Sequence, residues 1–143
     1  MKAEIIAVGT ELLLGEITNT TTPYVARELA QLGVDVYHQS VVGDNQARLT
    51  EALQQATTRS DLIILTGGLG PTKDDLTKQT VAQYVNEPLV IDQPAMAQIE
   101  AFYQQRQRQM TANNRVQAML PAHATPLENP AGMAVGAFYQ TAN

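Results

Sequence analysis

Three strand-like runs, each followed by a glycine-containing turn and a helical pattern, constrain the fold of this chain more than any other feature. Two of them are apolar, residues 3–8 (AEIIAV) and 61–66 (DLIILT), and the other, residues 34–42 (VDVYHQSVV), is rich in residues that favour strands. Apolar runs without strict alternation are typical of strands that are covered by helices on both faces of a sheet. The order strand, helix, strand, helix, strand, helix predicts parallel βαβ units. We therefore expect an α/β fold, a three-layer sandwich with a mostly parallel sheet.

Apolar residues recur at helical spacing between and after these runs. The predicted helices span residues 19–32, 46–58 and 74–84. Pro23 falls in the first turn of the first helix, where its missing N–H removes no helical hydrogen bond. Gly33 is expected to close that helix as a C-terminal cap. The third helix is expected to begin between Thr72 and Asp74.

Beyond residue 86 the pattern is less regular. We expect a short strand at residues 89–91, a helix over 93–110 with a narrow apolar stripe, a short helix ended by Pro121, and extended segments around a Pro-Ala-Gly turn. The length of 143 residues predicts a single domain, residues 1–143. Because the chain stops directly after the strand-like AFYQ, we expect it to be a fragment of a longer protein, truncated at its C-terminal end.

Charge and composition exclude several classes of protein. The formal net charge is −5 and the sequence pI is about 4.9, whereas a general nucleic-acid surface needs a basic field. There is no cysteine, and hence no disulfide or thiolate metal site. No apolar run has the length of a membrane span, and the N-terminal segment is not a signal peptide. We expect a cytoplasmic protein with neither a nucleic-acid nor a membrane partner.

The turn after the third run carries the strongest functional signal. It reads LTGGLGPTKDDLT, residues 65–77. Gly67, Gly68 and Gly70 allow a sharp turn whose amides a ligand can approach closely. With the partial positive charge of a helix start, such a turn favours an anion, most naturally phosphate. The spacing matches neither the dinucleotide pattern GxGxxG nor the phosphate loop GxxxxGK[ST].

Four acids are expected near this anion site. Asp74 and Asp75 follow the glycines, while Glu11 and Asp44 follow the first and second strands. Helix capping accounts for one of the adjacent aspartates. The others indicate either a divalent cation that bridges carboxylate and phosphate oxygens or an acid that binds hydroxyls or ring nitrogens of the ligand. Both alternatives stay open at this point.

Covalent catalysis by a serine or a cysteine is excluded by the side-chain inventory. His38 and His123 have no partner at metal-ligand spacing, so each is expected to be a surface or half-buried residue. Ser40 and Ser60 do not lie in a nucleophile-elbow pattern. Any hydrolytic chemistry is therefore expected to use an activated water.

Four segments, VGTELLLGEI, VVGDN, RSDLIILTGGLGPTKDDLT and MTANNRVQAMLP, resemble the CinA family, also called competence/damage-inducible protein. The resemblance covers essentially the whole chain. It implies the MoaB/Mog molybdopterin-binding fold, a following C-terminal amidohydrolase domain in the full-length chain, and self-association into a homo-oligomer. Met133 and Val135 stand where the family pattern has Thr and Pro, and Thr21 stands where it has Asn.

The resemblance implies metal-dependent hydrolysis of a nucleotide pyrophosphate such as ADP-ribose, with a divalent metal cation as cofactor. Asp75, Asp74 and Asp44 would be catalytic, and Asp75 and Asp44 would hold the metal. The implied ligand or phosphate-binding residues are Thr10, Glu11, Asn19, Thr66, Gly67, Gly68, Gly70, Thr72, Asn114 and Gln117.

Two other functions are compatible with the same acids and glycines. The first is binding of molybdopterin or another pterin phosphate, or adenylyl transfer to it, as the wider fold suggests. The second is a non-catalytic module that binds nucleotide and oligomerises.

Overall fold

The computed structural model describes residues 1–142, and the chain forms two compact units, one ending at Gly68 and one beginning at Leu69. Each unit is described by itself, and the expected single domain stays a prediction. Among the described residues, no helix is both long and apolar enough to cross a membrane.

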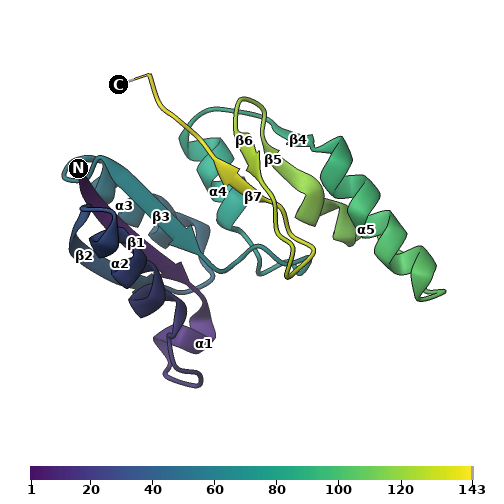
Figure 1. Ribbon diagram of the computed structural model, residues 1–143, viewed down its shortest axis with the longest axis horizontal. Coiled ribbons are helices and arrows are strands. Elements are labelled where there is room, and N and C mark those ends of the chain that lie inside the picture. The colour runs from purple at the N-terminus through teal and green to yellow at the C-terminus, as the bar shows by residue number, and fades with distance from the viewer. Residues whose placement is uncertain (143) are drawn as a thin grey trace. The chain divides into compact units, whose positions relative to one another are not determined.

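The first unit is built on a three-stranded parallel sheet (Figure 1). Its strands are β1 (Lys2–Val8), β2 (Asp35–Val42) and β3 (Leu62–Thr66), in the order β2-β1-β3. In the register, Ile5 of β1 lies opposite Gln39 of β2 and Ile64 of β3. The central strand is buried from Ala3 to Val8, because both of its edges are paired and both of its faces are covered. The predicted parallel sheet is confirmed.

Helices cover both faces of this sheet. They are α1 (Thr10–Leu13), α2 (Thr21–Gln31) and α3 (Gln46–Thr57). Leu29 of α2 packs against Ala3 and Ile5, whereas α3 buries Leu49 and Leu53. Right-handed crossovers from β1 to β2 and from β2 back to β3 place α2 and α3 on opposite faces (Figure 1). This arrangement gives the three expected layers.

Local signals in the sequence fix the ends of these helices. Pro23 lies in the first turn of α2, and Gly33 follows the helix with a φ of 73°, which a residue with a Cβ rarely adopts. Asn45 caps α3, since its side chain accepts a hydrogen bond from the Arg48 N–H at 3.1 Å. Both predicted helices are confirmed to within two residues at each end.

The second unit combines helices with two small antiparallel pairs of strands. Its elements are α4 (Thr77–Tyr84), β4 (Leu89–Ile91), α5 (Gln93–Gln105), a 3-10 helix η1 (Ala112–Ala118), β5 (Met119–Pro121), β6 (Thr125–Leu127) and β7 (Gly136–Phe138). Strand β4 pairs with β5, and β6 pairs with β7.

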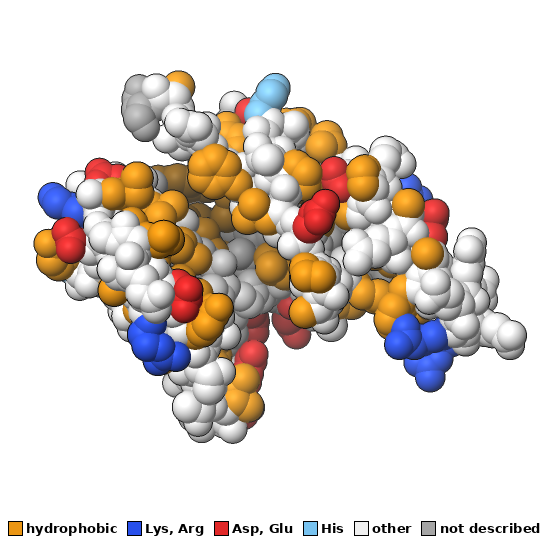
Figure 2. All heavy atoms as spheres, viewed as in Figure 1, with side chains coloured by type: hydrophobic (Ala, Val, Ile, Leu, Met, Phe, Trp, Pro, Cys, Tyr) orange, Lys and Arg blue, Asp and Glu red, His pale blue; other side chains and the backbone are white. Residues whose placement is uncertain are grey.

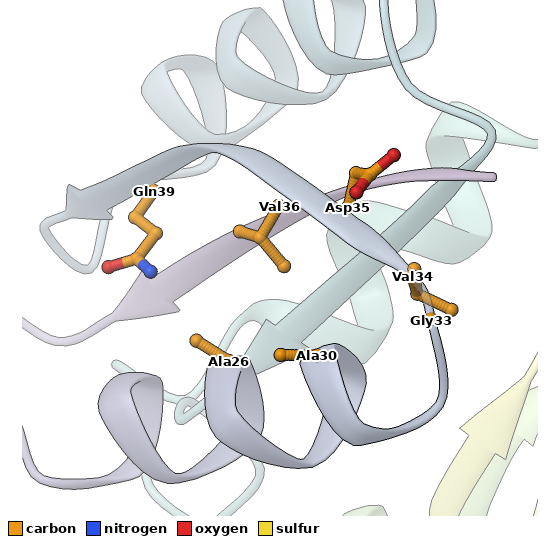
Figure 3. A pocket seen from close by; sticks show the side chains of 7 residues that line it. All are labelled: Ala26, Ala30, Gly33, Val34, Asp35, Val36 and Gln39. Carbon is orange, nitrogen blue, oxygen red and sulfur yellow. The ribbon is translucent and has the colours of Figure 1, made fainter.

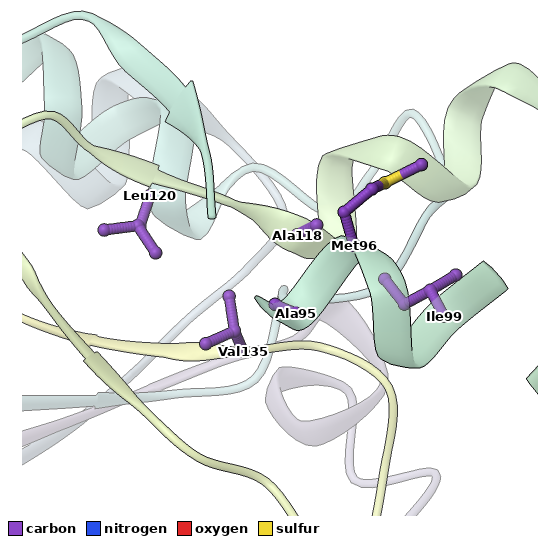
Figure 4. Packing of buried hydrophobic residues seen from close by; sticks show 6 residues of the cluster. All are labelled: Ala95, Met96, Ile99, Ala118, Leu120 and Val135. Atoms are coloured by element: carbon purple, nitrogen blue, oxygen red, sulfur yellow. The ribbon is translucent and has the colours of Figure 1, made fainter. Parts of the chain in front are cut away.

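The core of the second unit lies against the apolar stripe of α5. Met96 and Ile99 of this stripe are buried. Figure 4 shows them gathered with Ala118 at the end of η1, Leu120 of β5 and Val135 just before β7. The narrow stripe is therefore a packing surface.

Three predicted boundaries in the second unit are wrong. Helix α4 begins at Thr77, because the Asp75 carboxylate accepts hydrogen bonds from Thr72 and closes a separate turn before the helix. Helix α5 ends at Gln105, with Gln107 at a φ of 51° just beyond it. The residues before Pro121 form strand β5, since pairing with β4 overrides the helical pattern there.

Candidate functional site

In the first unit, the loops that follow β1 and β2 are joined directly at the carboxyl edge of the sheet. The Thr10 N–H donates to Asp44 Oδ2 at 3.1 Å, and the Asp44 N–H donates to Thr10 Oγ1 at 3.0 Å. The Gly9 N–H also donates to the Val42 carbonyl at 2.9 Å. This reciprocal pair fixes the Asp44 carboxylate through one of its two oxygens.

The third loop of this edge requires glycine for two reasons. Gly67 and Gly68 have φ values of 88° and 65°, in the left-handed region. A Cβ on Gly67 would also lie 2.1 Å from the Val8 carbonyl oxygen, inside any contact distance. The third loop is therefore packed against the end of β1, directly before the loop that carries Thr10.

Glu11 also lies at this edge. A Cβ on Gly9 would meet Glu11 Oε1 at 2.8 Å, so the carboxylate folds back over the Gly9 backbone. The side chain remains exposed. In the first unit, the structure thus brings Glu11, Thr10, Asp44 and Gly67 to one edge, as the parallel topology predicts.

The second unit contains the acidic half of the glycine turn. Asp75 Oδ2 accepts from the Thr72 N–H at 2.9 Å and from Thr72 Oγ1 at 2.7 Å. A Cβ on Gly70 would lie 2.6 Å from the same oxygen, so Gly70 packs against the carboxylate. Asp74 is exposed and makes no hydrogen bond or ion pair with the residues that the structure describes. Asp75 is held in place and Asp74 is not.

Because α4 begins at Thr77, the electrostatic environment of the glycine turn differs from the one expected from the sequence. Asp74 and Asp75 lie before the helix rather than in its first turn. Residues 71–76 therefore separate Gly70 from the first residue of α4, so the glycine turn does not open the helix directly, and the donors next to Asp75 are the Thr72 N–H and hydroxyl. A helix cap also fails to explain Asp75, since α4 has Leu76 at its N-cap position.

Asn114 and Gln117 are buried side chains of η1. Asn114 Oδ1 accepts from the Thr111 N–H at 3.1 Å and from Thr111 Oγ1 at 2.7 Å, and Asn114 Nδ2 donates to Gln117 Oε1 at 3.5 Å. Asn113 Nδ2 donates to the Pro71 carbonyl at 3.2 Å. The 3-10 helix is therefore tied to the turn that holds Asp75.

Two further predicted ligand residues have local structural roles. Asn19 Oδ1 accepts from the Thr22 N–H at 3.1 Å, and Asn19 Nδ2 donates to Thr22 Oγ1 at 2.9 Å, which caps the start of α2. Thr66 ends β3 in register with Ala7. Their contact with a ligand stays a prediction.

Lys78 is a buried cation that the sequence did not single out. It is 5% exposed, and its Nζ donates to the carbonyls of Gln117 at 3.0 Å and Val135 at 3.3 Å. Burial lowers the pKa of Lys78 to about 8. Nothing in the sequence distinguishes it from an ordinary surface lysine of a helix, because its partners are backbone groups from distant segments.

Neither unit builds a metal cage from protein ligands alone. Within each unit, the described residues contain no group of three or more His, Cys, Asp or Glu that could hold an ion. Asp44 and Asp75 each keep Oδ1 free of hydrogen bonds to the described residues. Such carboxylates fit Mg²⁺, which is commonly bound by one or two carboxylates, waters and substrate phosphates.

Two cavities lie away from the predicted site residues. One, of about 350 Å³, lies between α2 and the edge strand β2, with Ala26 and Ala30 facing Val36 (Figure 3). The other, of about 410 Å³, lies in the second unit beside Asp92 and Glu128. Figure 2 shows Lys and Arg side chains in separate places rather than as one basic surface on the face shown.

Comparisons with known proteins agree with this fold. The family described as "Probable molybdopterin binding domain" matches residues 4–143. A Lactiplantibacillus plantarum protein, named as competence-damage inducible, is 63% identical over all 143 residues, which are 34% of its own length. The chain thus spans about one third of the curated relatives it matches.

Solved structures extend the comparison to the fold. The crystal structure of CinA from Thermoplasma acidophilum has a TM-score of 0.84 and 34% identity over 95% of this chain and 79% of that chain. The molybdopterin biosynthesis enzyme MoaB from Thermus thermophilus has a TM-score of 0.55 and 25% identity over 57% of this chain and 53% of that chain.

Proposed function

We propose, because this chain belongs to the CinA family of molybdopterin-binding-type domains, that it hydrolyses a nucleotide pyrophosphate such as ADP-ribose with the help of a divalent cation. Water would add to one phosphorus of the pyrophosphate, and the bridging P–O bond would break. The products would be AMP and ribose 5-phosphate, with one water consumed.

The observation that supports this proposal most is the way in which two carboxylates are held. Asp44 and Asp75 are each fixed through Oδ2 by a threonine, Thr10 or Thr72, and each leaves Oδ1 available. The fixed oxygen orients each carboxylate, and the open oxygen is the atom that can bind a cation or a water.

The residues have distinct proposed roles. In the first unit, the amides next to Gly68 would bind a phosphate, because a glycine has no side chain to block a ligand's approach to the backbone. Asp44, at the same edge of the sheet, would be a ligand of the cation, which would supply positive charge to the phosphate oxygens and lower the pKa of water. In the second unit, the open oxygen of Asp75 would accept a proton from the attacking water. Asp74, which no described residue fixes, makes a smaller contribution.

The test uses the full-length protein with ADP-ribose and Mg²⁺, with AMP measured by chromatography. Asp75→Asn keeps the size of the side chain and its Thr72 contacts but removes the base, so kcat should fall about 100-fold or more. Asp74→Asn should reduce it far less. Glu51→Gln, which changes an exposed carboxylate of α3, is the control that should leave kcat unchanged. Absence of AMP from the wild-type protein ends the proposal.

A second candidate function, binding of a pterin phosphate, is favoured by the description of the matching family and by the likeness to MoaB. Both ligands carry phosphate, so the glycine amides serve either. Calorimetric titration of the same protein with a molybdopterin precursor and with ADP-ribose separates them. Tighter binding of the pterin, together with no AMP formation, would replace the first candidate by the second.

A further inference from the structure

We propose that Lys78 is a positioning residue that fixes Asn114 and Gln117 for ligand binding; the inference rests on the proposed function of the site. It concerns only the second unit. Lys78 Nζ joins three segments, because it extends from α4 to the Gln117 carbonyl of η1 and to the Val135 carbonyl before β7.

One of the two carbonyls that Lys78 contacts, that of Gln117, accepts two hydrogen bonds. The Gln117 carbonyl accepts from Lys78 Nζ at 3.0 Å and from the Val135 N–H, also at 3.0 Å. Both of its lone pairs are therefore used. Since this carbonyl belongs to the residue whose side chain contacts Asn114, fixing it fixes the pair of buried amides.

The same network extends to the acidic turn. Asn113, next to Asn114, donates to the Pro71 carbonyl at 3.2 Å. A shift of η1 would therefore move both the amide pair and one end of the turn closed by Asp75. Lys78 of α4 contacts η1 near its C-terminal end, at Gln117, whereas Thr111 caps its N-terminal end.

The chemistry of the contact shows why a packing role alone does not account for a lysine here. The titratable residues of the elements that contact it are Arg115 of η1 and Tyr84 of α4. No carboxylate lies on η1 or β5, and Glu128, the one acid of the segment before β7, is exposed. Among the described residues, Lys78 forms no ion pair. Burying an unpaired cation costs stability that an apolar residue would not. The cation does suit a site for a negatively charged ligand.

The experiment compares Lys78→Met with Lys2→Met in the full-length protein. Lys2 is an exposed lysine at the start of β1, outside the predicted site, and serves as the matched control. Lys78→Met removes a charged donor from two carbonyls, so amide hydrogen exchange over residues 112–118 should become about tenfold faster or more. KM for ADP-ribose should rise about tenfold with kcat much less affected. Lys2→Met should change neither.

A double-mutant cycle distinguishes positioning from general destabilisation. If Lys78 acts through Gln117, Lys78→Met should have little further effect on KM in a Gln117→Ala background. Independent, additive effects would overturn the proposal. Lys78→Arg keeps the charge and the donors and should restore part of the affinity. If Lys78→Met does not fold, Lys78→Gln, which removes the charge but keeps a polar side chain, replaces it in both measurements.

The outcomes separate this inference from the proposed function. Unchanged exchange over residues 112–118 in the folded variant overturns the positioning role, whatever the ligand is. Faster exchange in a protein that does not bind ADP-ribose overturns the proposed function and the ligand-binding part of the inference, while the structural link from Lys78 to η1 stands.

Discussion

At the scale of single residues, contacts with backbone carbonyls determine the environments of Gly67 and Lys78. Gly67 must be glycine because its φ is 88° and because the Val8 carbonyl leaves no room for a Cβ. Lys78 is a buried cationic side chain, and its ammonium group donates hydrogen bonds to two backbone carbonyls. Each gives a prediction that single-site variants can test.

Gly67→Ala should destabilise the protein well beyond the cost of a left-handed φ. That cost is about 1–2 kcal/mol for a residue with a Cβ, and the overlap with the Val8 oxygen adds to it. Gly33→Ala is the control, since Gly33 has a φ of 73° but open space around its Cβ position. Chemical denaturation gives both free energies of unfolding. Equal values would show that the Val8 contact is unimportant.

Wild-type protein should gain stability relative to Lys78→Met as the pH rises from about 8 to about 10.4. The pKa of Lys78 is lowered to about 8 in the folded state. In this pH range the unfolded chain binds more protons than the folded protein, so the free energy of unfolding increases with pH. The full difference is roughly 3 kcal/mol. Denaturation at pH 7 and pH 10 measures it, and a difference that does not depend on pH would show that Lys78 is not desolvated.

At the scale of elements, β1 is joined to the end of α3 by a buried carboxylate. Glu4 of β1 is 1% exposed and accepts two hydrogen bonds from Arg59, at 2.9 Å and 2.8 Å, and one from Ser60 at 3.3 Å. The hydrogen bonds from Arg59 lower the pKa of Glu4, although burial acts in the opposite direction. The pair fixes the connection between α3 and β3 against the central strand.

Arg59→Met should lower the melting temperature by several degrees at neutral pH, because it leaves the Glu4 carboxylate buried with a single weak donor. The wild-type advantage should be present above the ordinary carboxyl pKa of about 4.3 and should be lost as the pH falls through the lower folded pKa. Thermal melts at pH 7 and pH 3 test both statements. Arg48→Met, on the exposed side of α3, should have little effect at either pH.

Element boundaries also show which signals were local. Asn45 could be predicted as a cap because its partner, the Arg48 N–H, is three residues away. The start of α4 depends on an equally local contact, since Asp75 bonds back to Thr72 three residues earlier and delays the helix, but the spacing of apolar residues does not reveal that turn. The strand β5 depends on pairing with β4, about thirty residues earlier in the chain, and no local pattern reveals that pairing.

At the scale of the whole molecule, each unit has a hydrophobic cluster of its own. Ile5 belongs to the cluster of the first unit, and Ile99 to that of the second; both are fully buried. Ile99→Ala should cost about 2–5 kcal/mol and should accelerate amide exchange mainly in α5, η1 and β5. Ile5→Ala should do so mainly in β1 to β3. Exchange that rises uniformly over the chain in both variants would show that the two clusters unfold as one.

The sequence by itself determined the parallel sheet, its order of elements and the glycine turn, because strand runs, helix caps and left-handed glycines depend on neighbours in the chain. It also placed Thr10, Asp44 and Gly67 at one edge, since parallel strands end on the same side. Which aspartate is fixed depends on the local contact of Asp75 with Thr72, whereas only the tertiary structure decided that Lys78 is buried against η1. The contacts of Lys78 join segments 39 and 57 residues apart, and no local pattern encodes them.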